Sequence, residues 1–227
     1  MTEEKQFFQR LLTDTKEKFL DSPVFAEQQQ LGSQWNYSVC GTPIQVGKGI
    51  LLGINWGVSG NHEPQTEMPD GKDIPTYNFI HRSRQFLENY LLLDFDKMNF
   101  NYTNLCFFRT PNEIFLRRKD YENSLPLFRQ FVEFIKPGWI FSLSNNNSKI
   151  LSQFGQLTDC RDFYDSEQKH KGVKANLWGH PYFSVPHPNA RVKTKSRNEI
   201  WERIGEQTLL LTLHDKPSET EKNEPLT

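Results

Sequence analysis

The stretch GILLGINWGVSG, residues 49–60, decides the fold that the sequence predicts. Residues 50–54 form a short apolar run, broken at Gly53, of the kind that a fully buried central strand shows. From Asn55 onward, glycines and small polar residues permit a tight turn and let a ligand approach the backbone. Open α/β sheets bind ligands at the carboxyl edge of their strands, so Asn55 marks a candidate site. The glycines match neither a dinucleotide fingerprint nor a Walker loop.

Helix and strand patterns alternate along the rest of the chain. Helices are expected over residues 3–20, 79–93, 125–135, 149–157 and 198–213, and strands over 99–108, 139–143 and 182–185, with a short one near 37–40. Asn123 or Ser124 is expected to cap the helix over 125–135. Residues 61–76 resemble a long surface loop, and residues 158–178 are charged and irregular. The pattern predicts one domain over residues 1–215, a three-layer α/β/α sandwich around a mainly parallel central sheet, followed by a disordered polar tail at 216–227.

Composition narrows the class of protein. The 227 residues suffice for one sizeable α/β domain, and the net charge of −1 means that any nucleic-acid surface must be a local patch. Cys40, Cys106 and Cys160 are widely spaced, which excludes a four-cysteine metal cluster and a disulfide framework. Neither a transmembrane run nor a signal peptide is recognisable. The expectation is a cytoplasmic, monomeric protein without a metal or an organic cofactor.

Three polar residues follow the predicted strands. Asn55 ends the first strand, Asn104 in YTNLCFF lies at or near the end of the second, and His187 in VPHPNAR follows the last. If the strands are parallel, these side chains meet at one edge of the sheet and converge on one pocket. Taken singly, each residue also fits a plain structural role, as a hydrogen-bonding residue at a strand end or in a loop.

These stretches carry a resemblance to a known family. GINWG resembles the first motif of the uracil-DNA glycosylase superfamily, whose single-strand-selective and mismatch-specific branches carry Gly-Ile/Met-Asn-Pro-Gly. HPNAR resembles the second motif, His-Pro-Ser-Pro-Arg, and residues 104–106, NLC, are similar to an Asn-x-Cys-Pro segment. The resemblance covers roughly residues 45–205. It implies a uracil-DNA glycosylase-like fold and a monofunctional DNA glycosylase for base-excision DNA repair, a hydrolase that cuts the N-glycosidic bond of a flipped-out deaminated or damaged base such as uracil.

The resemblance also implies a role for individual residues. His187 would donate a hydrogen bond to the carbonyl oxygen of the departing base, where negative charge develops. Asn55 would position the attacking water, and Asn104 would read the base through its amide. Trp56 would lie beside the base, and an aromatic residue further on, Tyr77 or Phe79, would stack on it.

The partner implied is DNA, single- or double-stranded, and not a membrane. Five cations stand in residues 187–203 against two glutamates, and Ser196 is expected to cap the last helix and offer an anion site at its amino end. Phosphate contacts of this kind give salt-dependent affinity without sequence information. The expected DNA-binding residues are Asn189, Arg191, Lys193, Lys195 and Arg197.

The chain departs from the family pattern at several positions. Trp56 replaces the motif proline, so its indole either fills the space of a base or stacks on a ligand, and no aspartate follows Asn55 closely enough to activate water. The alternative function is therefore a catalytically silent protein of the same fold that binds nucleic acid or a nucleotide. An unrelated α/β enzyme acting on a phosphorylated ligand is a third possibility, without a phosphate-loop motif to support it. An indole packed into the pocket would favour the silent protein, and an open slot would favour the enzyme.

Overall fold

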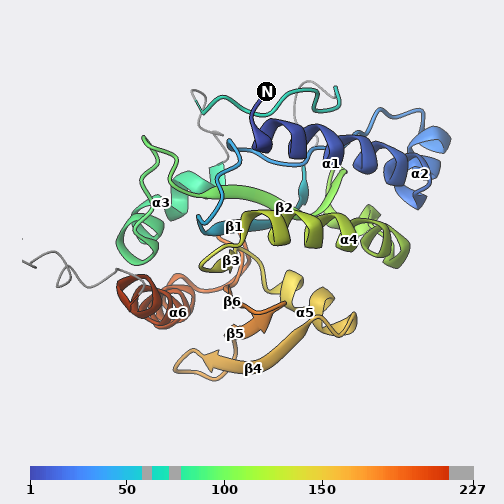
Figure 1. Ribbon diagram of the computed structural model, residues 1–227. Helices are drawn as coiled ribbons and strands as arrows, with labels where there is room; N and C mark the ends of the chain where they lie inside the picture. Colours follow the sequence, from blue (N-terminus) through green and yellow to red (C-terminus); the bar gives the residue numbers. More distant parts are fainter. Residues whose placement is uncertain (58–62, 72–77, 215–227) are drawn as a thin grey trace, which may run out of the picture.

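The computed structural model describes residues 1–57, 63–71 and 78–214, with the side chains of 78–82 and 210–214 left aside. Its centre is a six-stranded sheet in the order β2-β1-β3-β6-β5-β4 (Figure 1). β2, β1, β3 and β6 run parallel, and β5 and β4 continue the sheet antiparallel. The strands are β1 (Ile50–Trp56), β2 (Asn101–Arg109), β3 (Ile140–Ser142), β4 (Leu157–Tyr164), β5 (Lys171–Leu177) and β6 (His180–Ser184). The predicted α/β class with a mainly parallel sheet is confirmed.

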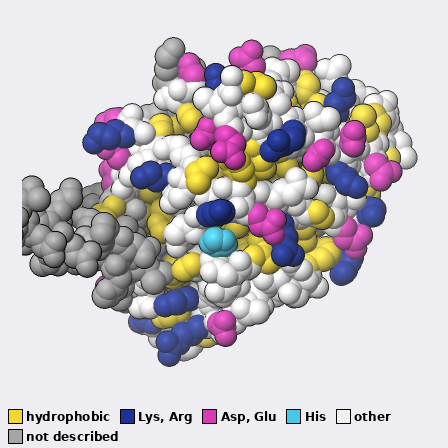
Figure 2. Space-filling view, in the orientation of Figure 1, with side chains coloured by type: hydrophobic (Ala, Val, Ile, Leu, Met, Phe, Trp, Pro, Cys, Tyr) yellow, Lys and Arg dark blue, Asp and Glu magenta, His cyan; other side chains and the backbone are white. Residues whose placement is uncertain are grey.

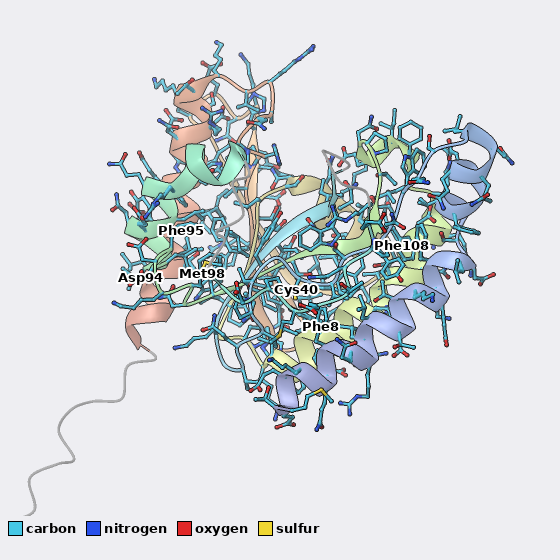
Figure 3. All side chains as sticks on the ribbon, turned by 90° about the horizontal axis from the view of Figure 1, so that it is seen from above. Phe8, Cys40, Asp94, Phe95, Met98 and Phe108 are labelled. Atoms are coloured by element: carbon cyan, nitrogen blue, oxygen red, sulfur yellow. The ribbon has the colours of Figure 1, made fainter. Side chains whose placement is uncertain are left out.

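Helices cover both faces of this sheet. The helices are α1 (Glu3–Leu20), α2 (Pro23–Leu31), α3 (Asn78–Leu91), α4 (Arg118–Ile135), α5 (Asn145–Gln153) and α6 (Thr194–His214), with a short 3-10 helix, η1, at Glu113–Phe115. Buried residues of α1, α2, α4 and α5 share one hydrophobic cluster, and those of α3 and α6 share another. Figure 3 shows Phe8 and Phe108 on the α1 side, and Phe95 and Met98 on the α3 side.

The apolar run of β1 lies between the two layers of helices and packs against both. Ile50 and Leu52 pack in the cluster of α1 and α4, whereas Leu51, on the opposite face, packs in the cluster of α3 and α6. All three side chains are fully buried. A strand buried on both faces has no polar side to show in its sequence, which is why a continuous apolar run predicted it.

Two predictions about strands are wrong. Residues 158–178, expected to be irregular, form most of the antiparallel pair β4 and β5. β4 is the edge strand, and most of its residues are exposed, so it lacks the apolar alternation that signals a strand. The expected strand near residues 37–40 is reduced to one isolated bridge between Tyr37 and Phe108.

Helix starts were predicted too late. α4 begins at Arg118 rather than at 125, so Asn123 and Ser124 lie inside the helix and do not cap it. The capping carboxylate is Asp120, whose Oδ2 accepts a hydrogen bond from the Arg117 backbone N–H at 2.7 Å. Ser124 instead accepts a bond from the Phe107 N–H of β2 at 2.9 Å.

Two further helices also begin before the positions expected. α5 begins at Asn145 behind the N-cap Ser144, and α6 begins at Thr194, so Ser196 is not its cap. The expected polar tail at 216–227 lies outside the described residues. Within the part of the chain that is described, no helix has the length and apolar character needed to cross a membrane.

Candidate functional site

A cavity of about 750 Å³ lies at the carboxyl ends of the parallel strands. It brings together four of the residues singled out from the sequence: Asn55, Asn104, His187 and Asn189. The other lining residues are Gly53, Ile54, Gly57, Tyr102, Pro111, Asn112, Glu113, Leu143, Ser144, Asn146 and Ala190. The convergence predicted from the parallel strands is thus present in the structure.

Asn55 is held in one orientation by the segment that follows β2. Its Nδ2 donates to Thr110 Oγ1 at 2.8 Å and to the Trp56 carbonyl oxygen at 3.2 Å. Because both contacts use the amide nitrogen, Oδ1 keeps its lone pairs, and it accepts no hydrogen bond from the described residues. The residue therefore presents an acceptor suited to a water or to another donor.

Asn104 lies in the middle of β2, not at its end, and pairs with Gly53 of β1. β2 continues to Arg109 because the apolar residues after Asn104 are fully buried. A Cβ added to Gly53 would lie 2.0 Å from Asn104 Oδ1, so the carboxamide occupies space that only glycine leaves. The residue is 1% exposed, and its buried Nδ2 has no hydrogen-bond partner among the described residues.

A buried amide without a partner costs roughly 1–3 kcal/mol. Asn104 is among the residues that line the cavity, and its buried Nδ2 is a donor that lacks an acceptor there. The same amide offers Oδ1 as an acceptor. The geometry therefore suits a ligand that presents a carbonyl group at this wall.

His187 follows β6 and is half-buried. Burial lowers the pKa of its imidazole below the usual value of 6.5, which favours the neutral ring. Its Nδ1 accepts a hydrogen bond from the Asn189 backbone N–H at 3.1 Å, so the single proton of the neutral ring is assigned to Nε2. The loop thus provides a neutral N–H donor at the cavity.

Trp56 does not line the cavity. It is 3% exposed, and its ring packs edge-on against Tyr102, with centroids 5.4 Å apart and an interplanar angle of 75°. The Arg109 guanidinium carbon lies 5.9 Å from its ring centroid. The indole is therefore part of the core. It does not fill the cavity, which was one of the two positions that the sequence allowed for it.

Among the described residues, the aromatic side chain that lines the cavity is that of Tyr102. Tyr77, a candidate for stacking on a base, lies outside the described residues, and the side chain of Phe79 in the first turn of α3 is also outside them. Tyr102 was missed because it was counted only as part of an apolar strand. The period of two along a strand puts positions 102 and 104 on one face, and this signal could have found it.

Sequence reasoning also missed the segment after β2. Glu113 in η1 lines the cavity, and its Oε1 accepts a hydrogen bond from Asn146 Nδ2 at 2.6 Å. Asn147, the next residue of α5, donates from Nδ2 to the Gly53 carbonyl oxygen and to Ser142 Oγ, both at 2.9 Å. The run of three asparagines at residues 145–147 joins the ends of β1 and β3 to the site, although it matches no motif in the sequence.

The basic segment after His187 is partly engaged within the protein. Lys193 Nζ lies 3.7 Å from Glu167 Oε1, and Lys195 Nζ lies 3.9 Å from Glu199 Oε1. Arg197 donates from Nη1 to the Pro188 carbonyl oxygen at 2.8 Å. Arg191 is exposed and makes no hydrogen bond or ion pair with the rest of the described chain. On the face shown in Figure 2, Lys and Arg side chains stand in small groups among acidic ones.

The cavity holds donors and acceptors but few charges. Of its described lining residues, Glu113 alone carries a carboxylate, and His187 is its one other ionisable group apart from Tyr102. Groups of three or more His, Cys, Asp or Glu side chains able to hold a metal ion are absent from the described ranges. In comparisons with known proteins, no family model matches the chain and no curated protein is significantly similar to it.

Proposed function

We propose that this protein is a monofunctional DNA glycosylase with a uracil-DNA glycosylase-like fold, acting on a flipped-out deaminated or damaged base. The observation that carries the proposal is the meeting of Asn55, Asn104 and His187 in one open cavity. These residues come from the stretches that resemble the family's motifs. The position of Trp56 in the core removes the main reason to favour a catalytically silent protein.

Cleavage breaks the bond between C1′ of the sugar and a nitrogen of the base, and the electron pair leaves with the base. Negative charge then grows on the carbonyl oxygens of the base, where a preorganised donor lowers the barrier. His187 supplies this donor through Nε2–H, in the tautomer that its bond with the Asn189 N–H favours. A neutral donor also avoids the cost of burying a full positive charge in the empty site.

Recognition of the base falls to Asn104. Its unpartnered Nδ2 donates to a carbonyl oxygen, and its Oδ1 accepts from a ring N–H, the pair of groups that uracil presents side by side. An amino group of cytosine at the same place would leave two donors facing each other. The arrangement therefore favours bases in which deamination has replaced an amino group with a carbonyl group.

The partner in this proposal is DNA, bound by a single copy of the protein. A base in a duplex reaches such a cavity only after it leaves the stack. Asn189 and Arg191, both exposed and close after His187 in the chain, would contact the backbone beside the extruded nucleotide. Such contacts give affinity that falls as salt rises.

The test is excision from labelled oligonucleotides that carry uracil, hypoxanthine, xanthine or hydroxymethyluracil, in single strands and in mismatches. Abasic sites are revealed by alkali. Asn55→Ala and His187→Ala are each expected to lower the excision rate by roughly 10²–10³-fold, the loss typical of a transition-state donor or positioning group. Thermal unfolding of each variant checks that the fold is retained.

His180→Ala is the matched control. His180 lies at the opposite end of β6, where its Nδ1 is 2.8 Å from the Pro137 carbonyl oxygen, and it does not line the cavity. This variant should cleave at the parent rate. A parent protein that cleaves none of the substrates, yet binds single strands in a salt-dependent way, would replace the enzyme with a binding protein.

A further inference from the structure

Glu113 is placed in the cavity by the same segment that holds Asn55. Asn55 Nδ2 donates to Thr110 Oγ1 at 2.8 Å, and Thr110 Oγ1 donates to the Asn112 carbonyl oxygen at 2.8 Å. Asn112 Oδ1 in turn accepts from the Ile114 N–H at 3.1 Å and starts η1. This connected set of bonds fixes the start of η1, the element that carries Glu113, beside Asn55.

The carboxylate is held from a second side by α5. Asn146, the second residue of that helix, donates from Nδ2 to Glu113 Oε1 at 2.6 Å. The amino end of a helix carries partial positive charge, which favours a negative group there. Oε1 is engaged in this way, whereas Oε2 accepts no hydrogen bond from the described residues.

Donors and acceptors are sorted by the elements that carry them. The donor groups are the His187 imidazole and Asn104 Nδ2, which suit a departing base that becomes negative. The acceptors are Asn55 Oδ1 and Glu113, which are joined through residues 110–113. Acceptors suit the sugar, where positive charge develops at C1′, and the water that attacks it.

We propose that Glu113 is a catalytic carboxylate of this site, which holds the attacking water together with Asn55 Oδ1 and takes its proton. This inference rests on the proposed glycosylase function. It supplies the base that the sequence lacks directly after Asn55. The negative charge of Glu113 also stabilises the positive sugar in the transition state.

The step balances without a further reactant. The water oxygen forms a bond with C1′ as the bond between C1′ and the base nitrogen breaks, and the base leaves with the electron pair. The proton of the water passes to Glu113 and from there to solvent, and the departed base takes a proton from solvent. The products are an abasic sugar and the free base, and Glu113 is again a carboxylate.

Glu113→Gln tests the charge while keeping the shape, because the glutamine oxygen still accepts from Asn146 Nδ2. The measurement is the single-turnover excision rate, with protein in excess over the best substrate of the parent, beside the affinity for an uncleavable 2′-fluoro analogue. We expect the rate to fall about 10²-fold or more, the loss typical of a missing general base. The affinity should stay within about twofold of the parent.

Glu122→Gln is the matched control, since Glu122 is an exposed carboxylate on α4 that pairs with Arg118 and Lys119 away from the cavity. Glu113→Asp, which restores a carboxylate, should be faster than Glu113→Gln. An excision rate for Glu113→Gln within twofold of the parent would overturn the inference and leave the glycosylase proposal standing. Equal slowing in Glu113→Asp and Glu113→Gln would assign the effect to packing and overturn it too. A parent that cleaves nothing would overturn both proposals.

Discussion

Gly53 and Asn104 act as one unit although they lie on different strands. The two residues are paired across β1 and β2, and the amide of Asn104 fills the space above a backbone that lacks a Cβ. This contact turns an otherwise ordinary buried strand residue toward the cavity. The glycine that breaks the apolar run of the central strand therefore has a structural reason that lies on the neighbouring strand.

Gly53→Ala should destabilise the protein and displace Asn104. The new Cβ would lie 2.0 Å from Asn104 Oδ1 and 3.4 Å from Tyr102 Oη. The cavity wall that Asn104 forms must therefore shift. Overpacking of this kind costs roughly 1–3 kcal/mol. Urea unfolding measures the loss, and the excision assay should show a parallel fall in rate.

Two further variants make this prediction specific. In Gly53→Ala/Asn104→Ala the clashing amide is gone, so most of the lost stability should return, as strongly coupled neighbours show in a double-mutant cycle. Gly57→Ala is the control for stability, because a Cβ there meets no atom of the described residues within 4 Å. Additive losses in the double variant would refute the proposed clash.

Asp120 shows how a single carboxylate can order two helices. It is fully buried, and besides the N–H of Arg117, the N-cap residue of α4, it accepts a hydrogen bond from the Val24 N–H of α2 at 3.1 Å. Burial raises the pKa of this carboxyl group, and the two backbone bonds partly offset that effect. The starts of α2 and α4 are therefore set together, from positions far apart in the chain.

Asp120→Ala is expected to destabilise the protein by about 2–4 kcal/mol, because the buried Val24 N–H and the part-buried Arg117 N–H both lose their acceptor. The midpoint of urea unfolding should move accordingly. Glu122→Ala, on the same helix but exposed, should stay within roughly 0.5 kcal/mol of the parent. A small effect of Asp120→Ala would mean that water replaces the carboxylate at both helix starts.

At the scale of the whole molecule, charge is nearly balanced, with 27 basic and 28 acidic residues. Under the proposed function, long-range attraction of DNA by the whole protein would therefore be weak, and binding would depend on a few cations beside the cavity. Two of the candidates, Lys193 and Lys195, lie near glutamates that already offset their charge. Arg191 keeps its full charge for a partner.

Arg191→Ala should reduce the salt dependence of DNA binding more than Lys193→Ala. On single strands, each phosphate contact contributes about 0.7 to the slope of log affinity against log salt concentration. The loss of Arg191 should remove close to that amount, and the loss of Lys193 clearly less. Fluorescence anisotropy across a series of KCl concentrations gives both slopes, and equal slopes would contradict the assignment.

The sequence predicted those elements whose hydrophobic pattern matches their burial in the structure. The buried strand β1 has an apolar run and the amphipathic helix α1 has a helical periodicity, and burial imposes both patterns, so both elements were predictable. The meeting of Asn55 and His187 followed from parallel strands alone. An exposed edge strand such as β4 has no such periodicity, and the start of α4 depends on a carboxylate bonded to another helix. Glu113 lies in the site because of the course of the chain after β2, and no local sequence pattern indicates that course.

The burial of Trp56 determines what position 56 contributes to the molecule. Its indole is buried against Tyr102, and a Cβ on Gly41 would lie 3.3 Å from its ring. Trp56, the residue after Asn55, is therefore constrained by packing in the interior beneath the cavity and not by contact with a ligand. A substitution at position 56 therefore acts first on the packing beneath the cavity, and a base bound in the cavity would sense it only through that packing.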